Sequence, residues 1–396
     1  MTHHRVFGAE LPTLALLGLG AGDAVVGLQR SLEPLLQLLR LPTLRATARW
    51  PMRRILVLGQ IAAVAAGAPL LAYGALAALP SPIGVVVALA SLAAVCAALA
   101  VAQTVWFPLL YHYPEPGHTG RFFGIVRSGW HAALIVYFVA AQQWLTARPG
   151  AFGALFAVGW ACGALRIALL ARLPEPAAAA ARGASAVDWR APLRDARFRA
   201  YLAAMSLAGA ARRTAAPFAL VWMRRELGVS DAELVWTTTA VYAGGLVSLY
   251  AFGLAADRFG TRPVFLGTAL VGAGATCALI GLPAAGTSLL GVAIALFFVQ
   301  SVSTSGFEVA DTNLLFRIAP PGGPAATLVT ASVTINAIHG LAPFAAGLAL
   351  EAALGAAVPP AQAYGALFAL CAALQLAALV PLRAAERDIP PARPAP

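Results

Sequence analysis

Long apolar stretches constrain this chain more than any other feature of its sequence. Hydrophobic residues make up 60% of its 396 residues and charged residues only 11%, whereas a soluble domain carries about 25% charged residues. A helix that spans a bilayer needs about 20 mostly apolar residues, and most of the stretches are at least that long. They lack the polar–apolar alternation of a membrane β-barrel. The sequence therefore predicts an all-α membrane protein with many spans.

The apolar stretches divide the chain into two predicted bundles of six helices each. The first bundle covers residues 1–172, with an incomplete first helix, and the second covers residues 198–389. A linker rich in Ala, Pro and Arg, residues 173–197, joins them, and residues 390–396 form a tail. The predicted spans are residues 9–21, 24–43, 54–79, 83–111, 122–146, 151–172, 198–223, 232–253, 264–285, 287–314, 325–349 and 361–382.

The basic residues are distributed as in a membrane protein. The net charge is +11, and all 27 basic residues are arginine. They lie mainly between the apolar stretches and form no patch on a soluble domain, so we expect no nucleic-acid binding. Arginine gathers in the loops that follow the second, fourth and eighth spans and in the linker. Because such loops stay on the cytoplasmic side, the linker and the tail are predicted to be cytoplasmic.

The two halves of the chain repeat short segments at a nearly constant offset. LGAGDAVVG at 19–27 matches LGVSDAELV at 227–235, an offset of 208 residues, and FGALFA matches YGALFA 212 residues further on. Both offsets are close to half the chain length, which indicates a duplication. At the first offset Met1 falls on Gly209, so the first half has no counterpart of residues 198–208. We expect either a start upstream of Met1 or a truncated chain.

The loop between the eighth and ninth spans carries a recognisable motif. Its sequence, GLAADRFGTRP, has the pattern Gly-x-x-x-Asp-Arg-x-Gly-x-Arg at Gly253, Asp257, Arg258, Gly260 and Arg262. Together with two six-helix halves and a cytoplasmic linker, this motif resembles the major facilitator superfamily of secondary transporters over nearly the whole chain. The turn PEPGHTGRFFGIVRSG, residues 114–129, is similar to a turn in many members. The resemblance implies two bundles that rock against each other in alternating access around a small solute.

The resemblance also implies a conformational latch at this loop. In the family, such loops hold one half to the other in one state and release it in the other. Gly253 would let two helices approach closely, and Gly260 would permit a sharp turn. Asp257 would meet the start of the fifth span, residues 121–124, where the helix dipole is positive.

The latch would be completed by ion pairs with the tenth span. Arg258 and Arg262 would pair with Glu308 or Asp311, which share a helix face at i, i+3. The alternative is a solvated turn that only sets topology. The loop between the second and third spans keeps Arg54 but has no acid of the motif, so any latch would be one-sided.

Polar side chains at membrane depth are the candidates for the transport site, because they are costly there. Arg212 and Arg213 lie near the middle of the seventh span and predict a site for an anion or another substrate group. The alternatives are an ion pair with an acid of another span, or a helix broken at Pro217 that admits water. Further cavity-lining candidates, for which interhelical hydrogen bonding is the alternative, are Gln300, Ser303, Asn336 and His339.

Two titratable residues of the first half are candidates for proton coupling. Glu33 is, apart from Glu10, the only acid well inside a span of the first half, although Arg30 at i−3 could pair with it. His131 in the fifth span could titrate near neutral pH, but a single histidine in a bundle is more often a hydrogen-bonded packing residue. His3 and His4 lie too close to the terminus to enter this prediction.

Missing motifs narrow the function classes. The sequence has no phosphate-binding GxxxxGK[ST] and no HExxH, GxSxG or Cys/His cluster, so we expect neither an enzyme nor a cofactor or metal ion. We expect a monomeric, multi-pass secondary transporter in a bacterial inner membrane, with a small-molecule substrate, a coupling ion and membrane lipid as its partners. The alternatives are a lipid flippase or scramblase on the same scaffold, or a membrane receptor or assembly protein that transports nothing.

Overall fold

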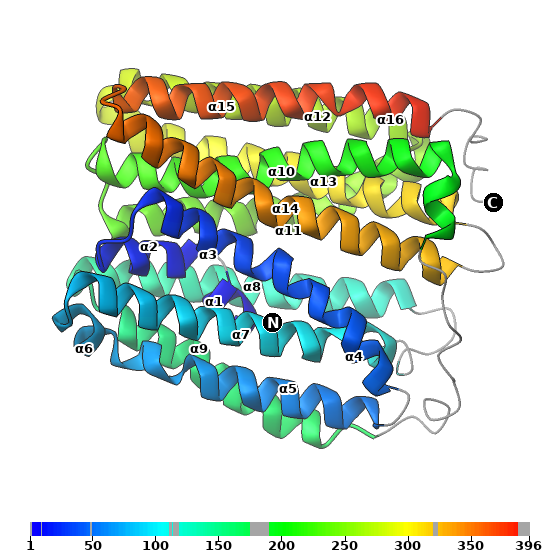
Figure 1. Cartoon of the computed structure of the whole chain (residues 1–396), viewed down its shortest axis with the longest axis horizontal. Helices are drawn as coiled ribbons and strands as arrows, with labels where there is room; N and C mark the ends of the chain where they lie inside the picture. Colours follow the sequence, from blue (N-terminus) through cyan, green and yellow to red (C-terminus); the bar gives the residue numbers. More distant parts are fainter. Residues whose placement is uncertain are drawn as a thin grey trace. The chain divides into compact units, whose positions relative to one another are not determined.

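The computed structural model describes residues 2–8, 10–47, 50–110, 113, 119–174, 190–319 and 324–386. Within these ranges every regular element is a helix (Figure 1). The chain divides into two compact units, Met1–Ala186 and Val187–Pro396. The predicted turn at 114–129 and the predicted linker lie partly outside the described residues.

The first unit contains six helical segments in its described part, some of them interrupted by a short 3-10 turn. They are α1 (Thr2–Gly8) with α2 (Glu10–Gly18); α3 (Asp23–Leu36) with η1 (Gln37–Leu39) and α4 (Arg40–Thr47); α5 (Met52–Gly67) with η2 (Ala68–Ala72) and α6 (Tyr73–Ala78); α7 (Ser81–Leu110); α8 (Thr119–Ala147); and α9 (Phe152–Ala171).

The described part of the second unit also contains six long helical segments, preceded by the short turn η4 (Ala191–Arg194). They are α10 (Ala196–Arg225); α11 (Asp231–Phe259); α12 (Thr261–Ala278) with η5 (Leu279–Ser288); α13 (Leu289–Ile318); α14 (Pro324–Gly355); and α15 (Pro360–Ala377) with α16 (Leu379–Ala385). The predicted pattern of six helices in each half is thus confirmed.

Local sequence explains where the helices of the second unit begin and end. The Asp195 side chain accepts a hydrogen bond from the Arg197 amide and caps α10. Ser230 and Glu233 form a reciprocal capping box at the start of α11. This helix ends at Gly260, where φ is +81° and ψ is 176°, a backbone conformation that only glycine adopts readily. The sharp turn predicted at Gly260 is therefore present.

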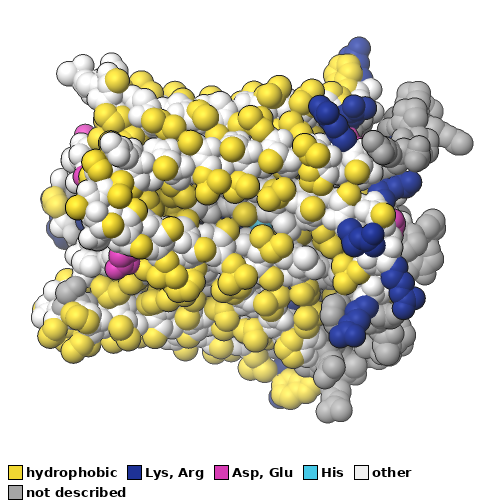
Figure 2. All heavy atoms as spheres, turned by 45° about the horizontal axis from the view of Figure 1, so that its top comes forward, with side chains coloured by type: hydrophobic (Ala, Val, Ile, Leu, Met, Phe, Trp, Pro, Cys, Tyr) yellow, Lys and Arg dark blue, Asp and Glu magenta, His cyan; other side chains and the backbone are white. Residues whose placement is uncertain are grey.

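The outer faces of the helices suit a membrane. Seven stretches of the described chain are long and apolar enough to cross a bilayer, and one of them, Thr261–Ile318, contains both α12 and α13. Large aliphatic side chains such as Val247, Leu270 and Leu341 are exposed. On the face shown in Figure 2, hydrophobic side chains cover most of the surface, whereas basic side chains gather mainly at the right-hand edge. This surface is that of a multi-pass membrane protein.

The first helical segment begins earlier than the sequence predicts. The predicted span starts at residue 9, but α1 starts at Thr2 and packs against α9. His3, Val6 and Phe7 are each at most 1% exposed. The polar residues at the start of the chain lower the average hydropathy of this segment. A hydropathy average therefore does not predict α1, although tertiary packing buries it.

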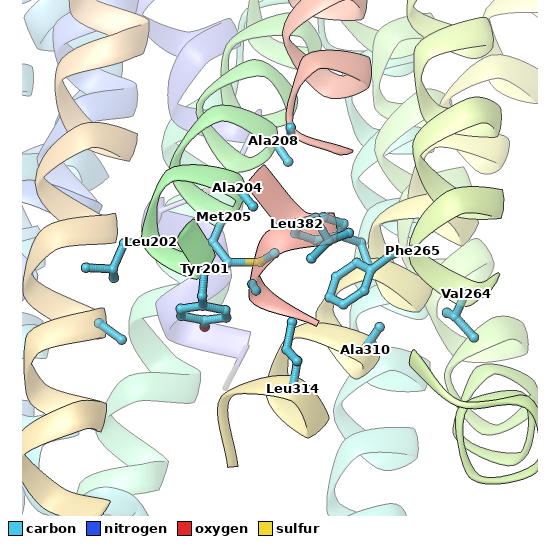
Figure 3. Close-up of a cluster of buried hydrophobic side chains, with 14 of the residues drawn as sticks. Tyr201, Leu202, Ala204, Met205, Ala208, Val264, Phe265, Ala310, Leu314 and Leu382 are labelled. Carbon is cyan, nitrogen blue, oxygen red and sulfur yellow. The ribbon is translucent and has the colours of Figure 1, made fainter. Parts of the chain in front are cut away.

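A cluster of buried side chains holds the second unit together (Figure 3). Tyr201 and Met205 of α10 meet Phe265 of α12, Leu314 of α13 and Leu382 of α16. Small alanines between them allow close helix approach, which drives association in membranes. The cluster fixes α10 against its neighbours and so positions Arg212, about two turns beyond Met205.

Candidate functional site

Arg212 lies midway along α10 and holds three helices together. Its Nη1 donates hydrogen bonds to Ser303 Oγ at 2.9 Å and to Thr304 Oγ1 at 3.3 Å, both on α13. Its Nη2 donates to the Thr268 carbonyl of α12 at 3.1 Å, which also accepts from Ser303 at 2.6 Å. The guanidinium lies 4.7 Å from the centre of the Phe307 ring. These contacts fix the side chain from several directions.

The charge of Arg212 has no carboxylate partner within ion-pair distance in the described chain. Its hydrogen bonds go to hydroxyls and a carbonyl. The charge of Glu308 acts on it, but this residue is exposed. Neutral acceptors and an aromatic ring therefore offset the cost of the buried cation. Within the described residues, the alternative of an ion pair between Arg212 and an acid of another span is wrong.

A small cavity adjoins this arginine. The volume within which the centre of a water molecule fits is ≈ 20 Å³. This is room for about one water molecule. Arg212 Nε and Gln375 Oε1 are both buried without a hydrogen-bond partner among the described residues. One water molecule could accept from the first atom and donate to the second. The lining residues are Arg212, Ala215, Gly272, Thr276, Gln300, Thr304 and Gln375.

The absence of a side chain at position 272 keeps the cavity open. A Cβ on Gly272 would lie 2.6 Å from both Gln375 Oε1 and Ser303 Oγ, and 3.2 Å from Arg212 Nη2. All three atoms belong to the polar network. Any larger residue would therefore push this network apart.

Arg213 points away from this network. It is exposed, whereas Arg212 is partly buried, because consecutive residues are about 100° apart around a helix. Its charge acts on His339 of α14, whose Nε2 lies 3.1 Å from the Met205 carbonyl. Asn336 Nδ2 donates to the Ser332 carbonyl of its own helix at 2.8 Å.

Five of the six predicted substrate residues thus fall into two groups, while Asn336 bonds within α14. Arg212, Gln300 and Ser303 meet at or beside the cavity, whereas Arg213 and His339 belong to the side of α10 that packs on α14. The sequence prediction treated the two arginines as one pair. Their different faces follow directly from the helix repeat.

Several members of the polar network were not predicted. Thr268 and Thr276 flank Gly272 at intervals of four residues and so share one face of α12. Gln375 donates to Thr276 Oγ1 at 3.0 Å. Two signals could have found them: the Thr-x-x-x-Gly-x-x-x-Thr spacing, and a glutamine inside an otherwise apolar stretch of α15.

The ion pairs predicted for the latch are absent from the described structure. Asp311 accepts a hydrogen bond of 2.6 Å from the Tyr201 hydroxyl, and Glu308 is exposed. Arg258 lies 5.3 Å from the centre of the Phe259 ring. Glu308 and Asp311 lie on one helix, α13, as predicted. However, Tyr201 of α10 binds Asp311, an acid that the loop arginines were expected to reach.

Two further latch predictions meet different outcomes. A Cβ on Gly253 would meet no atom within 4 Å, so this glycine does not serve close helix packing within its own unit. Asp257 is exposed at the end of α11. The side chains of residues 121–124, its expected partners, lie outside those that the structure describes.

The positive charge of Arg262 acts on a different acid, Glu386 at the end of α16. Thr261 Oγ1 donates a hydrogen bond of 2.8 Å to Glu386 Oε1. Burial raises the pKa of Glu386 above its usual range, although the Thr261 hydrogen bond and the charges of Arg262 and Arg317 oppose this shift. The loop after α11 is thereby tied to the end of the last helix.

Glu33 of the first unit lies near a histidine that the sequence prediction set aside. His4 Nε2 is 3.6 Å from Glu33 Oε1 and 2.9 Å from Gln103 Nε2. Arg40 Nη2 in turn donates to Gln103 Oε1 at 2.6 Å. Arg30, the alternative partner of Glu33, instead lies 3.8 Å from Glu10.

His131, the other proton-coupling candidate, is not part of this cluster. It is 7% exposed, and its Nδ1 lies 2.9 Å from the Arg127 carbonyl one turn earlier. Its ring also lies 4.1 Å from that of Trp130. These contacts are those of a hydrogen-bonded packing residue.

Comparison with known proteins identifies what the chain resembles. Residues 201–396 match the family model described as the Major Facilitator Superfamily. Among curated proteins, none matches this sequence.

Several solved structures are similar over almost the full chain. A mutant of the nucleoside transporter NupG has 14% identity and a TM-score of 0.69, covering 96% of this chain and 100% of that one. A POT family transporter in complex with 5-aminolevulinic acid has 12% identity and a TM-score of 0.72, covering 96% and 93%. A bacterial homologue of the iron transporter ferroportin, in an inward-facing state, has 17% identity and a TM-score of 0.67, covering 98% and 96%. The likeness establishes the fold.

Proposed function

This chain belongs to the major facilitator superfamily, and from that membership we propose that it is a secondary active transporter for a small solute. Alternating access would expose a site near the membrane midplane to each side in turn. The two six-helix units are the parts that would move. Structures of similar fold come from a nucleoside transporter and from a transporter bound to 5-aminolevulinic acid, which supports a small polar organic solute.

The substrate class that we propose rests on one observation, the exposure of Arg213 midway along α10. An arginine exposed to lipid at this depth would be very costly, so such residues face a bundle interior or a water-filled path. Other faces of α10 pack against α15 and α16, and α14 lies beside Arg213, whose charge acts on His339. The side that carries Arg213 would therefore border the transport path. A guanidinium there suits a carboxylate or phosphate, so we propose an anionic or zwitterionic substrate.

The other predicted residues would support this contact. Asn336 and His339 of α14 would line the path beside Arg213. Arg212, Gln300 and Ser303 would form the wall behind it, since their hydrogen bonds join α10 to α12 and α13. The wall would keep Arg213 in place as the units move.

The loop Gly253–Arg262 would act as the cytoplasmic latch. Asp257 and Arg258 are exposed at the end of α11, and Asp257 makes no ion pair within the described residues of its unit. Both side chains would thus be available to the first unit in one state. Tyr201–Asp311 and Thr261–Glu386 would brace the loop from behind.

The protein would lie as a monomer in a bacterial inner membrane. Its arginine-rich loops would face the cytoplasm, as the positive-inside rule requires. In this orientation the latch loop and Glu386 would lie on the cytoplasmic side.

A two-stage experiment tests the proposal. Purified protein is first screened by thermal shift against carboxylates, phosphates and neutral analogues, because a bound ligand raises the melting temperature. A radiolabelled form of the best ligand is then offered to proteoliposomes preloaded with the unlabelled compound. We expect counterflow of the label. A ligand that stabilises the protein but shows no counterflow would indicate a receptor instead.

A further inference from the structure

Four side chains form a continuous chain of contacts through the first unit. Arg40 of α4 donates to Gln103 of α7, Gln103 contacts His4 of α1, and His4 faces Glu33 of α3. His4 is 8% exposed. The helices α1, α3 and α4 all pack against α7, so the contacts are held by the framework of the unit.

The hydrogen-bond donors fix the protonation of His4. Arginine is always a donor, so the oxygen of the Gln103 carboxamide must face Arg40 and its nitrogen must face His4. That nitrogen can only donate, and it lies 2.9 Å from His4 Nε2. His4 Nε2 is therefore an acceptor, and the imidazole is neutral with its proton on Nδ1. The 3.6 Å from His4 Nε2 to Glu33 Oε1 is longer than a hydrogen bond.

We propose that His4 and Glu33 together form a proton-binding site, and that this proton is the coupling ion of the transport cycle. The coupling rests on the proposed function; the proton site itself does not. A proton added between the two groups would create the missing hydrogen bond from His4 Nε2 to Glu33 Oε1.

The added proton would also change the state of Gln103. A protonated Nε2 and the Gln103 amide nitrogen are both donors and repel each other, so the carboxamide must turn or retreat. Turning presents its nitrogen to Arg40 and breaks the 2.6 Å bond to that residue. Proton binding on α1 and α3 would thereby loosen α4, the helix that leads into the loop after the second span.

Charged groups of both signs surround the pair. The Glu33 carboxylate attracts a proton to His4, whereas the charges of Arg5 of α1 and Arg166 of α9 repel it. Glu33 is also acted on by Arg40 and lies near Cys96 of α7. Buried polar atoms without a partner among the described residues lie on α1, η1, α4 and α5, and water could satisfy them and deliver the proton. They are His3 Nε2, Gln37 Oε1, Arg40 Nε and Gln60 Oε1.

Infrared difference spectroscopy on the full chain in liposomes, without substrate, tests the site directly. Spectra are recorded between about pH 8 and pH 3, a range that spans the usual pKa values of histidine and of a glutamate carboxyl group. The His4→Gln variant identifies the imidazole signal of His4 by subtraction. His131→Gln and Glu308→Gln are the matched controls, since the first histidine bonds its own helix and the second acid is exposed.

Two variants should move the midpoint of the His4 signal in opposite directions. Glu33→Gln removes the carboxylate and should weaken proton binding about tenfold or more, a shift of about one pH unit or more to lower pH. Gln103→Glu replaces a donor by an acceptor and should move the midpoint to higher pH. The controls should leave it unchanged.

The proposal is overturned if the His4→Gln and wild-type spectra superimpose, or if neither Glu33→Gln nor Gln103→Glu moves the midpoint. If His4→Gln fails to fold, the opposite shifts of the other two variants decide. Because no substrate is present, a negative result leaves the transport proposal standing, and a failed counterflow assay leaves the infrared result standing.

Discussion

Tyr201 of α10 donates a hydrogen bond of 2.6 Å to Oδ1 of Asp311 of α13. The tyrosine is fully buried and belongs to the cluster in Figure 3 that unites α10, α12, α13 and α16. The Asp311 carboxylate is thus bound by a neutral hydrogen-bond donor, the Tyr201 hydroxyl of the same unit. The bond thereby fixes one end of α13 to α10 and leaves the loop arginines to other partners.

Tyr201→Phe should lower the melting temperature. The substitution keeps the ring in the core but removes a hydrogen bond to an acid, worth about 1–2 kcal/mol between membrane helices at the upper end of measured values. Thermal unfolding in detergent measures the effect. Tyr250→Phe is the control, because Tyr250 is 76% exposed. Equal melting of the two variants would show that the bond contributes nothing.

Gly272→Ala should disrupt the Arg212 network, because the new Cβ would lie 2.6 Å from two polar atoms. We expect a lower melting temperature and loss of ligand stabilisation. Gly274→Ala, on the same helix, is the matched control, since its Cβ would meet no atom within 4 Å. If both variants bind ligand as the wild type does, the cavity and the Arg212 network do not help to hold Arg213 in place for the substrate.

Glu386→Gln should change how stability depends on pH. Because the folded-state pKa of Glu386 is raised, the folded protein binds this proton more tightly than the unfolded chain does. The stability from this group is full at low pH and is lost as pH rises through the folded-state pKa. The variant should thus match the wild type near about pH 4 and melt higher near about pH 7.

The control for this pH dependence is Glu226→Gln, at an exposed position after α10. Its melting difference from the wild type should not vary with pH. A constant difference for Glu386→Gln as well would contradict the burial of the Glu386 carboxyl.

The helices were largely predictable because apolar length alone determines what can cross a bilayer. The exception is α1, whose His3, His4 and Arg5 hide a buried segment from any hydropathy average. Its burial comes from packing against α9, which a local pattern does not reveal. For the same reason, His4 was missed as the neighbour of Glu33.

The site was predictable only as far as single helix faces allow. Gln300 and Ser303 were predicted as polar residues of α13 with interhelical hydrogen bonding as their alternative role, and both make such bonds. Other members of the Arg212 network, Thr268 and Gln375, come from other helices, and their meeting depends on tertiary packing. Likewise, the i, i+3 spacing of Glu308 and Asp311 predicted a shared face but not that Tyr201 would bind one of them.

The most direct test of the account is ligand stabilisation measured on Arg213→Gln. An anionic or zwitterionic compound that raises the melting temperature of the wild type should lose its effect in this variant, while the unliganded melting temperature stays near that of the wild type. Arg383→Gln, an exposed arginine on α16, should keep the full shift. If Arg213→Gln also keeps it, or if only neutral compounds stabilise the protein, then Arg213 is not the substrate contact and the substrate is not an anion.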